Sequence, residues 1–312
     1  MDKLSKGGSD LQFDLLQKYV DISNVVIYRI PNPNSKSLYH VDKPIDQYKK
    51  NIVWTQQSYD MIESFSIQHH YDTVDKIVFA SNWQEKKYVE TFKIPSYKNV
   101  VIENGIEPIP EHNKPSTNTN HLCYMSTPYR GLDVLLQAFQ YIQDLDIHLH
   151  VFSSLKIYAQ DSKDEKYEQL YDFCKNHPKI TYYSSVSHDT IKDALQEMHV
   201  LAYPSTFEET SCISVIEAMS AQCDVVCPNL GALPETTNRF ANMYCYEEDK
   251  LKHAELFAKY LQYSIESYSQ DNHKLQKEFF DSRYSWNDII KYKWYTMIDS
   301  IKKQKPLNLR YQ

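Results

Sequence analysis

The chain is 312 residues long and 42% hydrophobic, which suffices for one large globular domain or two of ordinary size. A formal charge of −7 and a pI near 5.9 argue against a protein that binds nucleic-acid phosphates, since such proteins present a basic face. No apolar run approaches the roughly 18 residues of a membrane helix, and the N-terminus lacks a signal-peptide core. We therefore expect a cytoplasmic protein with at most peripheral membrane contact.

Short runs rich in β-branched and aromatic residues recur along the chain and predict β-strands. An early series lies at 24–28, 52–55, 77–80 and 99–102. A later series lies at 121–125, 147–152, 180–183, 199–203, 224–227 and 243–246. Longer amphipathic or polar stretches separate most of these runs, which is the rhythm of βαβ units. The sequence thus predicts an α/β fold with two parallel-sheet, Rossmann-like units.

A segment rich in Pro, Asn and Thr separates the two series of strands. It reads NGIEPIPEHNKPSTNTN, from 104 to 120, and has few apolar residues, which is typical of an interdomain linker. We therefore predict an N-terminal domain at 1–106, a linker at 107–120 and a C-terminal domain at 121–280.

The remaining segment, 281–312, is predicted to form a long amphipathic closing helix with a tail. Its apolar residues recur at helical spacing, at Trp286, Ile289, Ile290, Trp294, Met297 and Ile301.

Cysteine usage indicates a reducing compartment. The six cysteines form no Cys-x-x-Cys pair and are scattered through apolar segments. Cys223 and Cys227 could in principle bind a metal, but their surroundings are typical of a buried strand, which favours buried thiols.

The segment PSTFEETSCISVIEAMSA, at 204–221, reads as the end of a strand, a loop and a helix. Ser211 is a good helix cap, and apolar residues then recur at helical spacing (Ile213, Ile216, Met219). In a parallel sheet such a loop lies at the carboxyl edge, where ligands bind. The free N–H groups of the helix start can then bind an anion such as a diphosphate.

Two carboxylates lie on either side of this helix start. Glu209 precedes the helix, and Glu217 lies about one and a half turns inside it, so both could accept hydrogen bonds from hydroxyls flanking a bound diphosphate. A nucleotide sugar has such hydroxyls, on its ribose and on its hexose. The alternative interpretation is that both glutamates are solvated surface residues, as charged residues on helices usually are.

The residues around these glutamates resemble glycosyltransferase family 4, whose members are retaining enzymes of GT-B architecture, with two Rossmann-like domains facing a cleft. The family pattern is a glutamate, seven residues, and a second glutamate followed by Ala-Met. A Pro-Ser pair precedes it and a Gly-x-x-Pro-Glu turn follows. Here these elements are PS at 204–205, Glu209, EAMSA at 217–221 and GALPE at 231–235.

Other segments resemble the same family in the expected order. KGGSDLQFDLLQKYV at 6–20 resembles its glycine-rich loop and first helix, and the stretch at 79–106 resembles the end of its first domain. STPYRGLDVLLQAF at 126–139 resembles the turn that carries a basic residue facing the diphosphate. RYSWNDI at 283–289 resembles the helix that crosses back to the first domain. All five glycines of the chain lie within these motif segments.

The resemblance implies roles for individual residues. Glu217 would hold the ribose and Glu209 the hexose, with Glu209 and Arg130 as the catalytic residues. The groups near the phosphates would be Arg130, Gly7, Gly8, Ser126, Thr210, Ser211, Cys212 and Ile213. No metal or other cofactor would be required.

The sequence departs from the family pattern near its N-terminus. Family members normally have a strand ahead of the Gly-Gly loop, whereas five residues separate Met1 from Gly7. Three explanations are open: a start further upstream, another segment in that position, or a trimmed domain. We expect a shortened N-terminal domain.

The candidate site also departs from the pattern. In WTQQSYD, at 54–60, Gln57 stands where many relatives have a histidine, and Gln57 and Asp60 are the candidate acceptor-side residues. A glutamine can bind a sugar hydroxyl but cannot take a proton. Of the usual two basic residues Arg130 is present, with Ser126 or Thr127 near the other position.

The sequence thus predicts a retaining glycosyltransferase that moves a hexose from a nucleoside diphosphate sugar to a hydroxyl acceptor on a glycan, lipid or protein-linked sugar. One alternative is a catalytically impaired relative that binds the nucleotide sugar in a scaffolding or regulatory role. Another is a GT-B enzyme with a different reaction, such as epimerisation. A metal site at Asp144 and Asp146, which mimics an acidic pair of the other glycosyltransferase fold, is disfavoured because the pair precedes a predicted strand.

Overall fold

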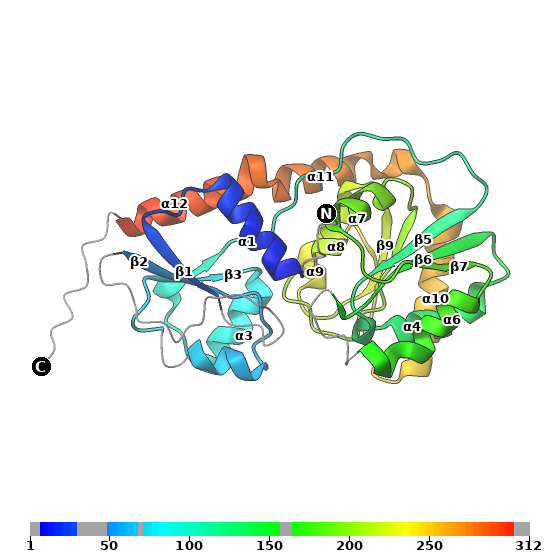
Figure 1. Ribbon diagram of the computed structural model, residues 1–312, viewed down its shortest axis with the longest axis horizontal. Helices are drawn as coiled ribbons and strands as arrows, with labels where there is room; N and C mark the ends of the chain where they lie inside the picture. Colours follow the sequence, from blue (N-terminus) through cyan, green and yellow to red (C-terminus); the bar gives the residue numbers. More distant parts are fainter. Residues whose placement is uncertain (1–6, 30–48, 68–70, 157–163, 303–312) are drawn as a thin grey trace, which may run out of the picture.

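The computed structural model describes residues 7–29, 49–67, 71–156 and 164–302, which form two α/β lobes side by side (Figure 1). Within these ranges the N-terminal lobe contains a four-stranded sheet and the C-terminal lobe a six-stranded sheet. Every strand pair described is parallel. Each of the ten predicted strand segments overlaps a strand of the structure, and the predicted α/β fold with two parallel sheets is confirmed.

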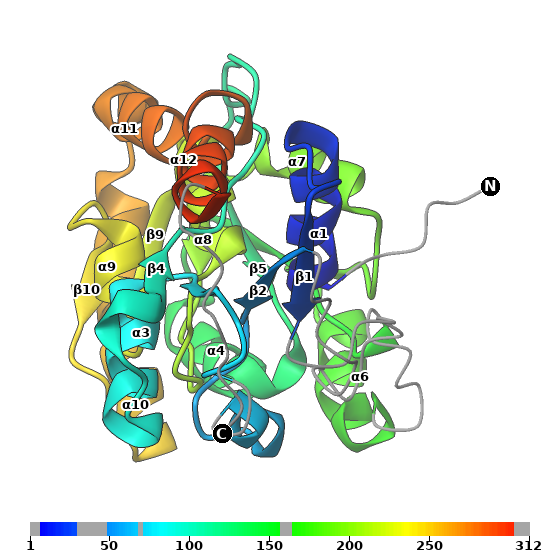
Figure 2. The same ribbon diagram turned by 90° about the vertical axis from the view of Figure 1, so that its left-hand side faces the viewer.

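The N-terminal sheet has the strand order β1-β2-β3-β4. Its strands are β1 (Val25–Arg29), β2 (Lys50–Trp54), β3 (Lys76–Phe79) and β4 (Asn99–Val101). Because side chains alternate along a strand, Ile52 and Trp54 face the helices α1 (Gly8–Tyr19) and α12 (Lys291–Lys302), whereas Val53 faces α3 (Asn82–Phe92). The sheet is therefore covered on both faces (Figure 2). Within the described residues β1 is the first strand and follows α1; residues 1–6 lie outside the description.

The C-terminal sheet has the strand order β10-β9-β8-β5-β6-β7. Its strands are β5 (Asn120–Met125), β6 (Ile147–Phe152), β7 (Ile180–Tyr182), β8 (Val200–Ala202), β9 (Asp224–Pro228) and β10 (Asn242–Tyr244). The chain builds outward from β5 to β7 and then returns to the other side of β5 to build β8. This reversal creates a topological switch point between β5 and β8, where doubly wound sheets bind their ligands.

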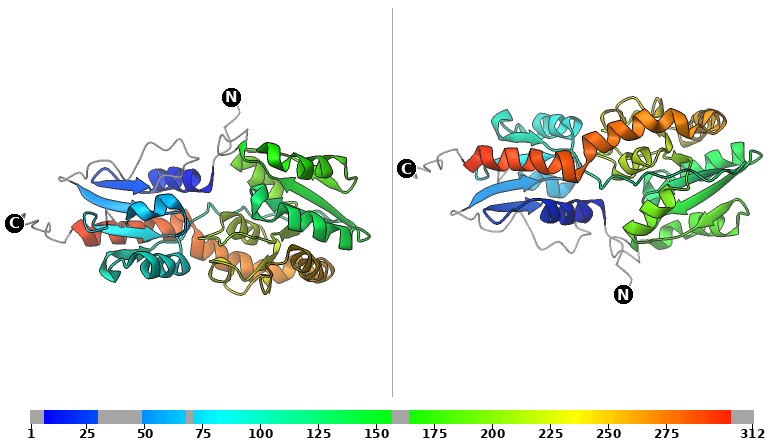
Figure 3. Two further views of the ribbon diagram at one scale, coloured as in Figure 1. Left: turned by 90° about the horizontal axis from the view of Figure 1, so that it is seen from below. Right: turned by 90° about the horizontal axis from the view of Figure 1, so that it is seen from above.

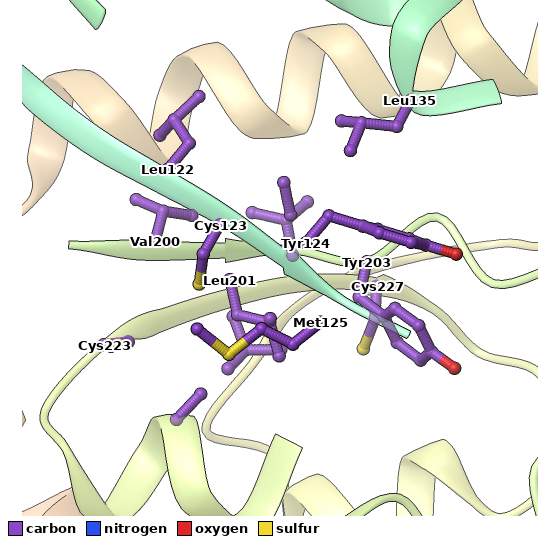
Figure 4. Close-up of a cluster of buried hydrophobic side chains, with 14 of the residues drawn as sticks. Leu122, Cys123, Tyr124, Met125, Leu135, Val200, Leu201, Tyr203, Cys223 and Cys227 are labelled. Carbon is purple, nitrogen blue, oxygen red and sulfur yellow. The ribbon is translucent and has the colours of Figure 1, made fainter. Parts of the chain in front are cut away.

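Helices cover both faces of the C-terminal sheet (Figure 1). One layer consists of α4 (Leu132–Ile142), α6 (Glu168–Asn176) and α10 (Lys250–Ser267). The other side carries α7 (His188–Leu195), α8 (Ile213–Ser220), α9 (Leu233–Thr237) and α11 (Lys274–Tyr284). Figure 4 shows Leu122 and Leu135 on one side of strand β5, with Cys123, Met125 and Leu201 on the other. A parallel sheet buried on both faces requires such continuous apolar runs.

The closing segment crosses from the C-terminal lobe to the N-terminal lobe, as seen from above in Figure 3. The predicted long helix is interrupted: residues Trp286–Ile290 form a π-helical turn, and α12 follows it. Such a turn inserts an extra residue and shifts the helix face. Ile289, predicted to be buried, is consequently 37% exposed, whereas the other predicted apolar positions are buried. The part of the tail at 303–312 lies outside the described residues.

The buried side chain of Gln12 joins α1 to both connections between the lobes. Its Nε2 donates to the carbonyl of Gly105 at 2.7 Å, and its Oε1 accepts from the N–H of Gly105 at 2.9 Å and from Nε1 of Trp286 at 3.1 Å. The two connections also bond to each other, because Trp286 N–H donates to the carbonyl of Ile106 at 2.9 Å. One amide therefore satisfies three buried polar groups where the lobes meet.

We predict that Gln12→Leu lowers the free energy of unfolding by about 3 kcal/mol, because it leaves the Gly105 and Trp286 groups buried without partners. Thermal unfolding followed by circular dichroism measures the effect, which should lower the midpoint by several degrees. Gln17→Leu, at an exposed position of the same helix, is the matched control and should change little. Equal midpoints for the two variants would contradict this role for Gln12.

Candidate active site

A cleft between the lobes is lined by segments that follow the carboxyl ends of strands. On the N-terminal side these are the start of α1 and residues after β2 and β4. On the C-terminal side they are the loops after β5, β6, β7 and β8 and the start of α8. The β5 and β8 loops carry Arg130 and Glu209, so these two residues lie at the switch point of the sheet.

Glu209 is a buried carboxylate held by two side chains. It is 3% exposed, with its Oε1 atom 3.0 Å from Nη1 of Arg130 and 2.5 Å from the Tyr203 hydroxyl, which donates to it. Burial raises the pKa of Glu209 above its ordinary value, although Arg130 and the Tyr203 hydrogen bond act in the opposite direction. The alternative that Glu209 is a solvated surface residue is therefore wrong.

Two glycines in left-handed conformations hold the Glu209 loop in place. Gly131, with φ of +106°, ends the turn that carries Arg130, and a Cβ on it would lie 2.1 Å from the carbonyl oxygen of Pro204. Gly231, with φ of +61°, belongs to the GALPE turn, and a Cβ on it would lie 2.5 Å from the backbone nitrogen of Glu209. Side chains at these positions would separate the three loops, which explains why glycine occurs here.

Glu217 is also buried, at 3% exposed, and faces the cleft from α8. Its Oε1 atom lies 2.6 Å from Nε2 of His188, the first residue of α7, whose side chain is 29% exposed. Burial lowers the pKa of His188, but the hydrogen bond and charge of Glu217 outweigh it, and the pKa is raised overall. The solvated alternative is wrong for Glu217 as well.

The starts of two helices meet at the cleft. A Cβ on Gly8, at the start of α1, would lie 3.1 Å from Cδ1 of Ile213, at the start of α8. The N–H groups of a first helical turn have no acceptor within their own helix, so both helix starts offer donors to an anion here. Ser211 is not the cap of α8, contrary to prediction: Cys212 occupies that position, and among the described residues it makes no side-chain capping bond. The reason is that the loop continues one residue further before it turns helical.

The structure brings most of the predicted site residues together. Those lining the cleft are Gly8, Gln57, Ser126, Arg130, Glu209, Thr210, Ser211, Cys212, Ile213 and Glu217. Thr127 lines it too, and its buried Oγ1 has no hydrogen-bond partner among the described residues. Gly7 caps α1 behind Gly8 and is not part of the lining. Asp60 is exposed and also lies outside the lining.

Residues of the two lobes contact each other directly beside the cleft. Thr210 Oγ1 donates to the carbonyl of Gln56 at 3.1 Å. The Glu235 carboxylate of the GALPE turn accepts from the backbone N–H groups of Asn82 and Trp83, at 2.9 and 3.0 Å. A carboxylate at the start of α3 is stabilised by the first-turn N–H groups and the helix dipole. These contacts bring the two halves of the site together.

The comparisons with known proteins agree with this geometry. The model of the family described as "Glycosyl transferases group 1" matches residues 107–279, more than half of the 312 residues. The chain belongs to this family. A search of curated proteins found no match.

Several solved structures have a fold similar to that of this group 1 glycosyltransferase. A glycosyltransferase from Rickettsia africae ESF-5 gives a TM-score of 0.70 at 18% identity, with 98% of this chain and 85% of that chain covered. Anabaena HepE, solved in complex with UDP-glucose, gives 0.63 at 13% identity, covering 81% and 72%. Sucrose-phosphate synthase from Thermosynechococcus elongatus gives 0.65 at 14% identity, covering 82% and 69%. The GT-B fold predicted from the sequence is confirmed.

Three residues of this glycosyltransferase that sequence reasoning missed are Tyr203, His188 and Glu235. Tyr203 directly follows β8, and this position at the carboxyl edge of the sheet could have identified it as a residue of the site. His188 follows Ser187, which caps α7 by accepting from the N–H of Thr190, and a serine before an amphipathic stretch is a recognisable helix start. The partner of Glu235 lies in the other lobe, and no local pattern points to it.

The alternative metal positions lie away from the cleft. Asp144 and Asp146 are exposed and precede β6, at the amino edge of the sheet, where Asp146 accepts from the Thr119 hydroxyl at 2.7 Å. Cys223 and Cys227 are buried free thiols, as predicted. All six cysteines fall within the described residues, and only Cys245 is exposed. No helix in the described ranges is long and apolar enough to cross a membrane.

We predict that Arg130→Gln destabilises this glycosyltransferase by about 3 kcal/mol at pH 8, because the buried Glu209 carboxylate loses its cation. Adding Glu209→Gln removes the stranded charge and should recover much of the loss. The destabilisation caused by Arg130→Gln alone should become smaller as the pH falls. The pKa of Glu209 is raised in the folded protein, so its carboxylate takes up a proton and no longer carries an unpaired charge. Thermal unfolding of the wild type, both single variants and the double variant measures this, and additive effects would contradict a coupled pair.

Proposed function

We propose that this protein is a retaining glycosyltransferase of family 4 that transfers a hexose from a nucleoside diphosphate sugar to a hydroxyl acceptor. The observation that carries the proposal is the position of Glu209 and Glu217. Both are buried, both line the same cleft, and they flank the start of α8, with Arg130 paired to Glu209. Buried carboxylates are costly unless partners or ligands compensate them, so their presence in a cleft favours a binding role.

The donor is proposed to lie across the start of α8. Its diphosphate would accept hydrogen bonds from N–H groups of residues 210–213 and of the α1 start, with Arg130 supplying positive charge. The hydroxyls of Ser126 and Thr127 lie in the same lining and are suitable additional donors. The ribose would then bind Glu217 and the hexose Glu209, because carboxylates accept hydrogen bonds from sugar hydroxyls.

Transfer is proposed to occur by front-face attack. The acceptor oxygen forms a bond to the anomeric carbon while the bond from that carbon to the diphosphate oxygen breaks. The acceptor proton passes to the departing diphosphate oxygen, so the products are a glycoside and a nucleoside diphosphate. Negative charge develops on the diphosphate, and Arg130 and the two helix starts, which line the same cleft, would stabilise it.

The acceptor is proposed to enter past Gln57, which lines the N-terminal side of the cleft and is buried. An amide can orient an acceptor hydroxyl without taking its proton, which suits a mechanism in which the diphosphate receives that proton. Asp60 is not included in this proposal, since it lies outside the cleft lining. We also propose a reducing location such as the cytoplasm, which suits six free cysteines.

Incubation with UDP-glucose, GDP-mannose and ADP-glucose tests the proposal, with release of free nucleotide and the anomeric configuration of the product as readouts. UDP-glucose is the first choice because it is the ligand in the HepE complex. We expect Arg130→Gln to lower the release rate about 100-fold or more, since it removes charge stabilisation of the leaving group. Lys175→Gln, at an exposed position of α6 outside the cleft lining, is the control and should act as wild type.

The outcomes separate the possible functions. Nucleotide release that Arg130→Gln and Glu209→Gln both leave unchanged would refute the proposed site. Saturable binding with no release, even with a range of acceptors, would instead support a nucleotide-sugar-binding protein without transferase activity. An inverted product would contradict the retaining mechanism while leaving transfer itself in place.

We propose further that transfer needs no metal ion, because Arg130 and backbone N–H groups carry the charge stabilisation. The expected result is an unchanged rate of nucleotide release after dialysis against EDTA and in its presence. A loss of activity that is restored by added Mg²⁺ or Mn²⁺ would contradict this part of the proposal.

A further inference from the structure

The two buried carboxylates of the cleft have partners of different chemistry. Glu209 is paired with Arg130, whose guanidinium is charged throughout the physiological pH range. Glu217 is paired with His188, whose imidazole gains or loses a proton near neutral pH. One side of the cleft thus has a permanent positive charge and the other a titratable one.

The contact between His188 and Glu217 is built by tertiary packing. Ser187 caps α7 and sets His188 at its first turn, and α7 packs against α8, which carries Glu217. Nε2 of His188 lies 2.6 Å from Oε1 of Glu217, so the imidazole donates an N–H to this oxygen. It can do so whether charged or neutral, since the neutral ring keeps one N–H. The second carboxylate oxygen of Glu217 remains the natural acceptor for a ligand hydroxyl.

The charged groups around His188 come from three parts of the fold. Glu217 acts from α8, while Asp189 and Lys192 act from α7 itself. Glu107 of the linker approaches Lys192 at 3.5 Å and partly compensates its charge. Because the hydrogen bond and the charge of Glu217 together outweigh the effect of burial, the pKa of His188 is raised above its ordinary value.

We propose that His188 is a positioning residue that forms one ribose-recognising unit with Glu217 and makes donor affinity depend on pH. The proposal rests on the proposed function. His188 holds the Glu217 carboxylate toward the cleft, and its protonated form adds a positive charge to a pocket that takes a dianionic nucleotide sugar. Binding is therefore tighter when His188 is protonated.

Donor binding and the protonation of His188 favour each other. The bound anion favours the imidazolium, so donor binding raises the pKa of His188 further and is accompanied by proton uptake. As the pH rises through this pKa the charge is lost and binding weakens. Coulomb's law for one charge near a dianion in a partly wet cleft gives a change of roughly threefold to tenfold between pH 6 and pH 8.

The test compares wild type with His188→Gln. A glutamine can still donate an N–H to Glu217 but cannot take a charge, so it keeps the hydrogen bond and removes the titration. His177→Gln is the matched control, since His177 caps α6 and is not part of the cleft lining. The probe is UDP-glucose, because its diphosphate diester keeps a constant charge between pH 6 and pH 8.

Dissociation constants measured by calorimetry at pH 6, 7 and 8 give the result. We expect the binding of wild type and of His177→Gln to weaken about threefold to tenfold more between pH 6 and pH 8 than the binding of His188→Gln does. Glu209 is present in all three proteins, so any titration of its carboxylate cancels in the comparison. In turnover experiments the effect should appear in KM rather than in kcat.

One outcome overturns the inference alone, and another overturns it together with the proposed function. Binding with the same pH profile in wild type and His188→Gln refutes the paired unit but leaves the transferase proposal intact. Failure of UDP-glucose and the other nucleotide sugars to bind wild type at any pH refutes the proposed function and this inference with it. If His188→Gln does not fold, NMR titration of the His188 imidazole in wild type decides: its pKa must rise when UDP-glucose is added, and an unchanged value overturns the inference.

Discussion

Parallel strands place all their carboxyl ends at one edge of a sheet, and this constraint organises the whole molecule. Each lobe presents the loops and helix starts that follow its strands at a single edge, and the two edges face one cleft. Polar backbone groups, helix dipoles and loop side chains therefore collect in one place, whereas both faces of each sheet are covered by apolar packing. The reversal of strand order between β5 and β8 adds the opening that brings Arg130 to Glu209.

Burying charged groups in the cleft is electrostatically unfavourable. Two carboxylates are almost fully buried within it, and each depends on a specific partner. Such sites are expensive to build and are stabilised by contacts elsewhere in the fold. Gly131 and Gly231 are part of that support, because their left-handed conformations let three loops approach within van der Waals distance around Glu209. The difference between an arginine partner and a histidine partner then gives the two sides of the cleft different responses to pH.

The two lobes are joined by polar contacts as well as by chain connections. Gln12 bonds to both crossings where they leave the N-terminal lobe, and Glu235 binds the start of α3 on the other side of the cleft. Gln12 and Trp286 at these crossings are fully buried, whereas the contacts of Glu235 and Thr210 are polar and lie beside the cleft. This arrangement fits the GT-B fold, in which two α/β lobes face a cleft.

Much of the fold was determined by the sequence alone. The strands were found because buried parallel strands are short apolar runs, and the linker because it lacks such runs; both are local properties. The Glu209 and Glu217 segment was also found, since a strand, loop and helix in succession identify a carboxyl edge. Tertiary structure decided the partners. His188 lies 29 residues from Glu217, and Glu235 lies 153 residues from Asn82, so neither contact follows from local periodicity. The tertiary structure also shows that Asp60 lies outside the cleft lining and that a π-helical turn interrupts the closing helix, which leaves Ile289 exposed. A local pattern says which face of an element is buried, but which residue meets which depends on how the elements pack.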